Sequence, residues 1–169
     1  MAMKFNFGKK KETEEVVYHF IFLEDVPMAT VASAVMAWQE SAWWPKKCSI
    51  HFLQKSAGAQ PAPAPKQPLF KQAPSAWVVE VTKFVPGRLQ ERTVKTGLWE
   101  GVEILRIEER ANGSRVVYEL HCQIKGFLKR ILWNFSYRKQ LEKDIKLIFS
   151  ALKEFIIKQH KAKQEGDSV

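Results

Sequence analysis

A β-hairpin is encoded by residues 101–124, which read GVEILRIEERANGSRVVYELHCQI. Two runs rich in strand-forming residues flank Asn112-Gly113, and both of these residues accept the positive φ of a type I′ turn. In the second run apolar and polar residues alternate, so one side of the strand should face a core and the other should face water. The apolar set is Val116, Tyr118, Leu120, Cys122 and Ile124, and the polar set is Arg115, Glu119, His121 and Gln123.

Two further runs before this hairpin extend the same pattern. Residues 77–84 (WVVEVTKF) and 88–95 (RLQERTVK) have strand character, and Pro86-Gly87 between them predicts a turn. An antiparallel meander with one wet face is therefore expected.

The N-terminal part of the chain predicts a strand, a helix and a second strand. Val16–Leu23 is apolar on both faces, which predicts a strand that is buried or covered on both sides. Asp25-Val26-Pro27 predicts the start of a helix that continues to about Gln39. Trp43-Trp44-Pro45 ends this helical region, and Cys48–Gln54 returns to strand character.

A long helix is predicted from Gly126 to about Lys161, with two apolar stripes. The centres of the stripes lie roughly 100° apart on a helical wheel, so the register changes near residues 136–140. A kink, a loosened turn or two different neighbours would each explain this change. The first stripe is Phe127, Leu128, Ile131, Leu132 and Phe135, and the second is Leu141, Ile145, Ile148, Phe149, Leu152, Phe155 and Ile156.

Length and composition indicate one domain. The chain has 169 residues and 46% apolar residues, enough for a single packed core. We expect this domain over residues 15–161, with flexible segments at 1–14 and 162–169. Residues 55–75 are rich in Pro and Ala and predict a loop within the domain, in which a short strand around Leu69 and Phe70 is possible.

The sequence favours a soluble, cytoplasmic protein. No apolar run reaches the roughly 18–20 residues of a transmembrane helix, and MAMKFNFGKKK at the N-terminus lacks the apolar centre of a signal peptide. Two cysteines, Cys48 and Cys122, are too few for a disulfide framework and are expected to be small buried hydrophobic residues.

The net charge of +9 is concentrated near the C-terminus, where residues 125–163 hold eleven Lys and Arg against three Asp and Glu. Ordinary solvation explains such a charge most simply. Contact with an anionic membrane is the alternative, through a helix face opposite the apolar stripe that carries Lys139, Lys143, Lys146 and Lys153. Nucleic-acid binding is not expected, because the strand faces with aromatic residues also carry the Val, Ile and Leu of a core.

No motif for catalysis or metal binding is found. The histidines are His19, His51, His121 and His160, and none has a second ligand at a spacing typical of metal sites. The sequence also lacks a nucleophile elbow and a glycine-rich phosphate loop. We therefore expect no metal and no cofactor, and the sequence identifies no catalytic residue. His19 and His51 could still face a cavity and orient a ligand or act as acid or base.

The order of these elements resembles the START-like superfamily (SRPBCC), which includes polyketide cyclases, dehydrases and lipid-transfer proteins. The resemblance rests on Trp43-Trp44-Pro45, on Trp77–Phe84 with Pro86-Gly87-Arg88-Leu89 after it, on the hairpin at Asn112–Val116, and on Gly126-Phe127-Leu128. It implies an α+β helix-grip fold. In this fold a curved antiparallel sheet of about six to seven strands wraps around the C-terminal helix, with short helices after the first strand.

The resemblance also implies an internal cavity between the sheet and the C-terminal helix. We expect this cavity to bind a hydrophobic small molecule or lipid, and we favour binding or transport over catalysis. The alternative is a cyclase or dehydrase that works in the same cavity without a cofactor and needs a His or a carboxylate inside it. The expected lining is Val35, Trp38, Val79, Val81, Tyr118, Leu120, Leu128, Ile131, Leu132 and Phe135.

Overall fold

The computed structural model describes residues 13–36, 43–54 and 75–166. In chain order its elements are β1 (Thr13–Glu24), α1 (Met28–Met36), β2 (Ile50–Gln54), β3 (Ser75–Val85), β4 (Leu89–Lys95), β5 (Glu100–Arg110), β6 (Gly113–Ile124), α2 (Phe127–Leu132), a π-helical turn (Trp133–Tyr137) and α3 (Arg138–Gly166).

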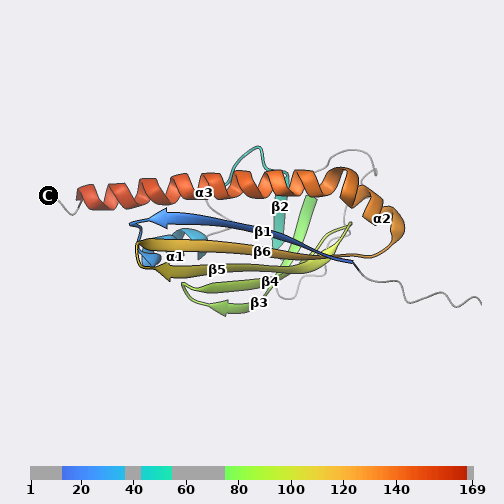
Figure 1. Ribbon diagram of the computed structural model, residues 1–169, viewed down its shortest axis with the longest axis horizontal. Coiled ribbons are helices and arrows are strands. Elements are labelled where there is room, and N and C mark those ends of the chain that lie inside the picture. Colours follow the sequence, from blue (N-terminus) through green and yellow to red (C-terminus); the bar gives the residue numbers. More distant parts are fainter. Residues whose placement is uncertain (1–12, 37–42, 55–74, 167–169) are drawn as a thin grey trace, which may run out of the picture.

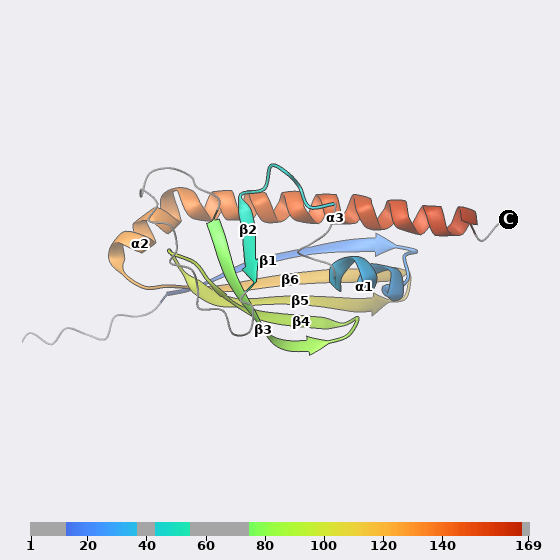
Figure 2. The same ribbon diagram turned by 180° about the vertical axis from the view of Figure 1, so that it is seen from behind.

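One sheet and one long helix form the two main layers. The strand order is β1-β6-β5-β4-β3-β2, and β1, β6, β5, β4 and β3 pair antiparallel in turn. Helix α3 runs along one face of the sheet, and the short α1 packs against β5, β6 and α3 near one end (Figures 1 and 2). The predicted α+β fold, with a curved sheet on a long C-terminal helix, is confirmed.

Strand β2 departs from the predicted all-antiparallel sheet because it pairs with β3 in parallel, from Ile50 opposite Ser75 to Gln54 opposite Val79. A parallel neighbour needs a connection of about a dozen residues or more. Residues 55–74 between the two strands supply that length.

The predicted hairpin joins β5 to β6, and its glycine is required by close packing. Arg110 pairs with Gly113, so Ala111 and Asn112 form the turn. Gly113 has a φ of +130°, and a Cβ atom there would lie 2.2 Å from the Leu23 carbonyl oxygen. The expectation of positive φ at Asn112 was wrong, because Gly113 alone of the two adopts it. The Asn112 carbonyl instead accepts a hydrogen bond from the Asp25 amide at 3.1 Å.

The first strand is covered on one face only, which corrects the expectation of a doubly covered strand. Its inner residues Val17 and Leu23 are buried. In the described part of the chain, no second layer of secondary structure covers the outer face. Its residues are therefore exposed, and they are Val16, Tyr18, Phe20 and Phe22. Arg115 of β6 partly shields them, since its guanidinium lies 4.5 Å from the centre of the Phe20 ring and donates a hydrogen bond to the Tyr18 hydroxyl.

Helix α3 supplies much of the core through the predicted second stripe. Leu141, Ile145, Ile148, Phe149, Leu152 and Ile156 are buried, and Phe155 packs against the core. Asp144 is buried on the same helix and accepts hydrogen bonds from Ser49 and Gln140. Both cysteines are free and buried, as predicted. The helix continues to Gly166, five residues beyond the predicted end at Lys161.

The predicted change of helical register is a π-helical turn, the loosened turn among the three explanations. It spans Trp133–Tyr137, between α2 and α3. Trp133 is buried, whereas the first apolar stripe on α2 is exposed. The extra residue per turn therefore lets the two parts of one continuous helical segment present different faces to the sheet.

Candidate ligand-binding site

The inner face of the sheet, which α1 and α3 cover, carries the candidate site. Side chains directly opposite one another in neighbouring strands share a face. One row that crosses this face contains Val81, Arg92, Glu103, Leu120 and Val17, from β3 to β1. The next row toward the β3–β4 turn contains Phe84, Gln90, Leu105, Tyr118 and His19.

A buried polar cluster of Arg92, Glu103 and Tyr118 occupies the centre of this face. Each of the three side chains is only 2% exposed. Arg92 Nε donates to Glu103 Oε2 at 2.5 Å. Burial raises the pKa of Tyr118 well above its usual value, and the charge of Glu103 and a hydrogen bond to it act in the same direction. The cluster therefore combines the Arg92–Glu103 salt bridge with a phenol that is neutral at neutral pH.

The inner face is exposed in the second half of β3, whereas Trp77 and Val79 in the first half are buried. Val81 is 50% exposed and Phe84 is 51% exposed, although their neighbours in β4 are the buried Arg92 and the half-buried Gln90. Helix α1 contacts β5 and β6, so it shields the middle of the sheet. Along the row of the polar cluster, burial thus increases from the exposed Val81 to the buried Leu120.

Aromatic residues gather at the end of the sheet nearest the π-helical turn. The rings of Trp77 and Trp99 pack edge-on with their centroids 5.1 Å apart. The rings of Trp99 and Trp133 do the same with their centroids 6.3 Å apart. The indole N–H groups of Trp99 and Trp133 are buried and make no hydrogen bond within the described part of the chain. A buried donor without an acceptor is unfavourable, so both groups could donate to an oxygen of a bound molecule.

The side chains of His19 and His121 point to opposite faces of the sheet. His19 faces inward, and its ring lies edge-on to Phe149 at 4.8 Å. Burial, with a smaller contribution from Lys146, lowers the pKa of His19. His121 faces outward, and its Nδ1 lies 3.0 Å from Glu14. The side chain of His51 lies outside the described residues.

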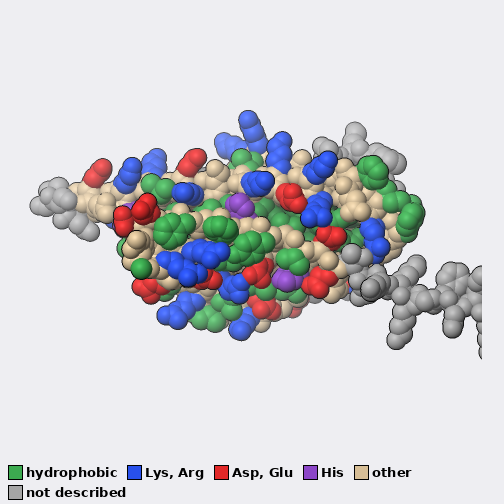
Figure 3. Space-filling view, viewed as in Figure 1, with side chains coloured by type: hydrophobic (Ala, Val, Ile, Leu, Met, Phe, Trp, Pro, Cys, Tyr) green, Lys and Arg blue, Asp and Glu red, His purple; other side chains and the backbone are tan. Residues whose placement is uncertain are grey.

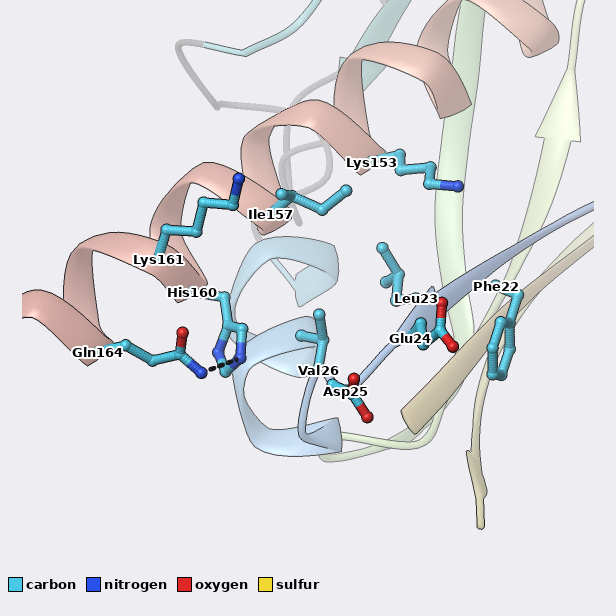
Figure 4. Close-up of a pocket in the computed structure, with 10 residues that line it drawn as sticks. All are labelled: Phe22, Leu23, Glu24, Asp25, Val26, Lys153, Ile157, His160, Lys161 and Gln164. Carbon is cyan, nitrogen blue, oxygen red and sulfur yellow. Dashed lines mark hydrogen bonds between the residues drawn. The ribbon is translucent and has the colours of Figure 1, made fainter. Parts of the chain in front are cut away.

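An open groove of about 550 Å³ lies at the other end of the molecule, between the end of β1, the start of α1 and the second half of α3. Ile157 extends from α3 toward Leu23 and Val26 (Figure 4). Charged and polar side chains complete the wall: Glu24, Asp25, Lys153, Lys161, His160 and Gln164. His160 Nε2 and Gln164 Nε2 lie 3.0 Å apart. The volume is in the range of about 300–1,000 Å³ typical of small-molecule sites, although the wall is more polar than usual.

A smaller hollow of about 280 Å³ lies on the outer face of the sheet. Gly101 forms part of it, along with Glu14, Glu91, Val102, Ile104, His121 and Gln123. Within residues 13–36, 43–54 and 75–166, no three His, Cys, Asp or Glu side chains are grouped as metal ligands. No helix in these ranges is both long enough and apolar enough to span a bilayer.

The structure divides the expected lining residues into two sets. Val35, Val79, Tyr118 and Leu120 are buried in the core, and Val81 lies at its exposed edge. Leu128, Ile131, Leu132 and Phe135 are instead on the outside of α2 and the π-helical turn. Trp38 lies outside the described residues. None of the nine described residues lines either hollow.

Arg92 and Glu103 on the inner face and the buried Trp133 of the π-helical turn are residues that the sequence analysis did not single out. The first two could have been found from strand alternation. Arg92 has the same parity as the apolar Val94, and Glu103 has the same parity as Leu105 and Ile107. Each of these neighbouring strands thus has one charged residue at a position where its other residues face the core. Two such charges of opposite sign indicate a buried ion pair.

No family model matches the chain, and the search of curated proteins finds no significant match. Among solved structures, the protein of unknown function SA2116 from Staphylococcus aureus is similar at 11% identity and a TM-score of 0.57, with 90% of this chain and 99% of that chain covered. The Polyketide_cyc-like protein Cgl2372 from Corynebacterium glutamicum is similar at 15% identity and a TM-score of 0.41, with 91% and 96% covered. Ara h 8.0201 is similar at 12% identity and a TM-score of 0.41, with 86% and 99% covered. At such identities a likeness shows the fold alone, and the fold is the one that the chain itself displays, a sheet packed on a long C-terminal helix.

Proposed function

We propose that this protein binds a hydrophobic small molecule or lipid between the inner face of its sheet and the C-terminal helix. The observation that carries the proposal is the buried cluster of Arg92, Glu103 and Tyr118 in the middle of this face. Burying an ion pair costs on the order of several kcal/mol of desolvation free energy for each ion. Apolar residues of similar size often stabilise a core better than such a pair does. A role in recognising the polar group of a ligand gives this cluster a function that packing does not.

The ligand that fits best is mostly apolar and carries an oxygen. Val81 and Phe84 offer exposed apolar surface beside the cluster. The buried indole N–H groups of Trp99 and Trp133 are donors that favour an acceptor on the ligand. The resemblance to the START-like superfamily supports the same class of ligand.

Binding is favoured over catalysis. A cyclase or dehydrase would need an acid or base that faces the bound molecule. Of the described residues, His19 faces inward with its ring against Phe149, and the inward Glu103 carboxylate is paired with Arg92. Both groups are thus engaged within the protein. We therefore regard Arg92, Glu103 and Tyr118 as ligand-orienting residues.

Exchange of such a ligand at an anionic membrane is part of the proposal. Lys139, Lys143, Lys146 and Lys153 are exposed on α3. Figure 3 shows Lys and Arg side chains along the α3 side of the molecule. Each Lys or Arg close to an anionic surface contributes about 1 kcal/mol to binding. Contact of this kind would be reversible and sensitive to salt.

Titration with a fluorescent dansyl-labelled fatty acid tests ligand binding. Val81→Lys places a charge at the exposed edge of the inner face and should weaken binding at least about tenfold, because the cation would need to be desolvated when the ligand docks. Thr93→Lys is the matched control, since Thr93 lies on the outer face one residue after Arg92. Ile157→Lys examines the groove in the same way. Loss of binding in Ile157→Lys with normal binding in Val81→Lys would move the site to the groove. Failure of the unmodified protein to bind the probe would contradict the proposal.

A further inference from the structure

The α2 end of the molecule exposes an unusual amount of apolar surface. Phe127 is 75% exposed, Leu128 is 74% exposed and Phe135 is 81% exposed. Ile131 and Leu132 lie between them and are also exposed. These five residues are here called the apolar tip. Figure 3 shows hydrophobic side chains at the α2 end of the elongated fold.

The apolar tip is not a core face that has lost its neighbour. The buried residue of this segment is Trp133, which is held by Trp99 and by the Tyr137 ring at 5.6 Å. At about 100° per residue, Trp133 falls on the side of the helix opposite the apolar tip. The segment is therefore anchored by Trp133 and directs its apolar side away from the protein, the reverse of an ordinary surface helix.

Positive charge surrounds the apolar tip. Residues 125–141 contain five basic residues and no acidic residue: Lys125, Lys129, Arg130, Arg138 and Lys139. All five are exposed, and Lys129 and Arg130 flank the apolar stripe on its two sides. The acidic groups that face this region come from elsewhere. Glu100 of β5 accepts a hydrogen bond from Lys125, and Arg138 pairs with Glu15 and Glu142.

We infer that the apolar tip inserts into the surface of an anionic membrane, with the surrounding Lys and Arg side chains among the lipid headgroups. Short amphipathic helices with a basic margin bind bilayers in this way, through buried apolar area and attraction to anionic lipid. Phe127, Leu128 and Phe135 supply the apolar area, and the five basic residues supply the charge complementarity. The Lys face of α3 would then lie beside the membrane rather than being its main contact.

This contact would place one end of the inner face against the lipid. Trp133 connects the two, because it lies beneath the apolar tip and touches Trp99 of the aromatic end. Because the purpose of the contact, ligand exchange, rests on the proposed function, the test measures membrane binding and ligand binding separately.

Co-sedimentation with vesicles tests the inference. The full chain is mixed with vesicles of phosphatidylcholine and phosphatidylserine, and with vesicles of phosphatidylcholine alone. We expect binding to the anionic vesicles that weakens but persists at 1 M salt, where charges are screened within about 3 Å. The double variant Phe127→Ser with Phe135→Ser should lower the partition coefficient by roughly tenfold or more per Phe removed.

Two control variants separate the apolar tip from other surfaces. Phe20→Ser with Phe22→Ser removes two exposed rings from the outer face of β1 and should leave vesicle binding unchanged. Lys143→Glu with Lys146→Glu alters the α3 face and should weaken binding far less than the loss of the two Phe side chains.

Binding that disappears with the α3 charges and is unaffected by the Phe substitutions would overturn the inference. Dimers that form with increasing concentration in gel filtration, and that the same Phe substitutions abolish, would also overturn it. The apolar tip would then bind a second copy of the chain. Normal binding of the dansyl fatty acid without vesicle binding would refute the membrane contact and the proposed exchange at a membrane, and it would leave the proposed ligand binding standing.

Discussion

Replacing Glu103 by Leu leaves the Arg92 guanidinium without its carboxylate in the centre of the inner face. Both side chains are 2% exposed, so water cannot take the place of the lost partner. Breaking a buried pair from one side costs about 3–5 kcal/mol. Tyr118 also loses the acceptor of its hydroxyl, which adds a cost of about 1–3 kcal/mol for a buried unsatisfied group. Against a typical stability of about 5–15 kcal/mol, Glu103→Leu should be severely destabilised.

Replacing all three members of the cluster should have the opposite result. The variant with Arg92→Met, Glu103→Leu and Tyr118→Phe removes both charges and the hydroxyl and keeps similar volume. Its stability should equal that of the unmodified protein or exceed it by about 1–4 kcal/mol. At the same time it should no longer bind the dansyl fatty acid, because the groups that orient the ligand are absent.

Urea unfolding followed by circular dichroism measures these differences. Glu119→Leu is the matched control, because its partner Arg106 is 43% exposed on the outer face, where an ion pair contributes about 0–1 kcal/mol. If the triple variant were as unstable as the sum of the single substitutions, the cluster would be a structural requirement. If it kept full affinity for the fatty acid, a role in ligand recognition would be refuted.

Three other predictions concern the helix, a histidine and a cysteine. A chain that ends at residue 140 should not fold, since it lacks six buried residues of α3 that contribute about 1.5–3 kcal/mol each; a cooperative melting transition of this fragment would contradict the position of the core. The lowered pKa of His19 means that the unfolded chain binds a proton more readily, so stability should decrease as the pH falls below the unfolded value of 6.5. In urea titrations His19→Gln should make this decrease smaller; an unchanged decrease in this variant would assign it to other groups. Burial raises the pKa of Cys48 to about 11, so only about one thiol in a thousand is ionised at pH 8. Iodoacetamide should therefore label Cys48 no faster than the protein unfolds. Rapid labelling of the folded protein, detected by mass spectrometry, would show that this side chain is accessible.

Strand and helix positions were predictable from the sequence because they depend on local patterns. The alternation in residues 116–124 and the second apolar stripe of the C-terminal helix both became core faces. The turn at Pro86-Gly87 was also predicted correctly, with Gly87 at a φ of +70°. Each of these signals is contained in a few neighbouring residues.

Features that depend on long-range partners could not be read in the same way. Apolar residues at Val16–Leu23 predicted a strand buried or covered on both faces, but whether a second layer exists is a property of the whole fold. Phe127, Leu128 and Phe135 have the same periodicity as a core stripe, and only the π-helical turn determines that they face outward. Strand alternation correctly put Tyr118 and Leu120 on one buried face of β6, and their role in a site stays a prediction. The pairing of Arg92 with Glu103 required the register of β4 on β5.

Native mass spectrometry of the freshly purified protein tests the central proposal most directly, together with mass analysis of the organic extract. We expect a population that carries one additional apolar, oxygen-containing molecule, and we expect the variant with Arg92→Met, Glu103→Leu and Tyr118→Phe to lack it while remaining folded. A spectrum that contains only the bare chain, combined with no binding of the dansyl fatty acid, would contradict the proposal that the sheet and the C-terminal helix enclose a ligand site.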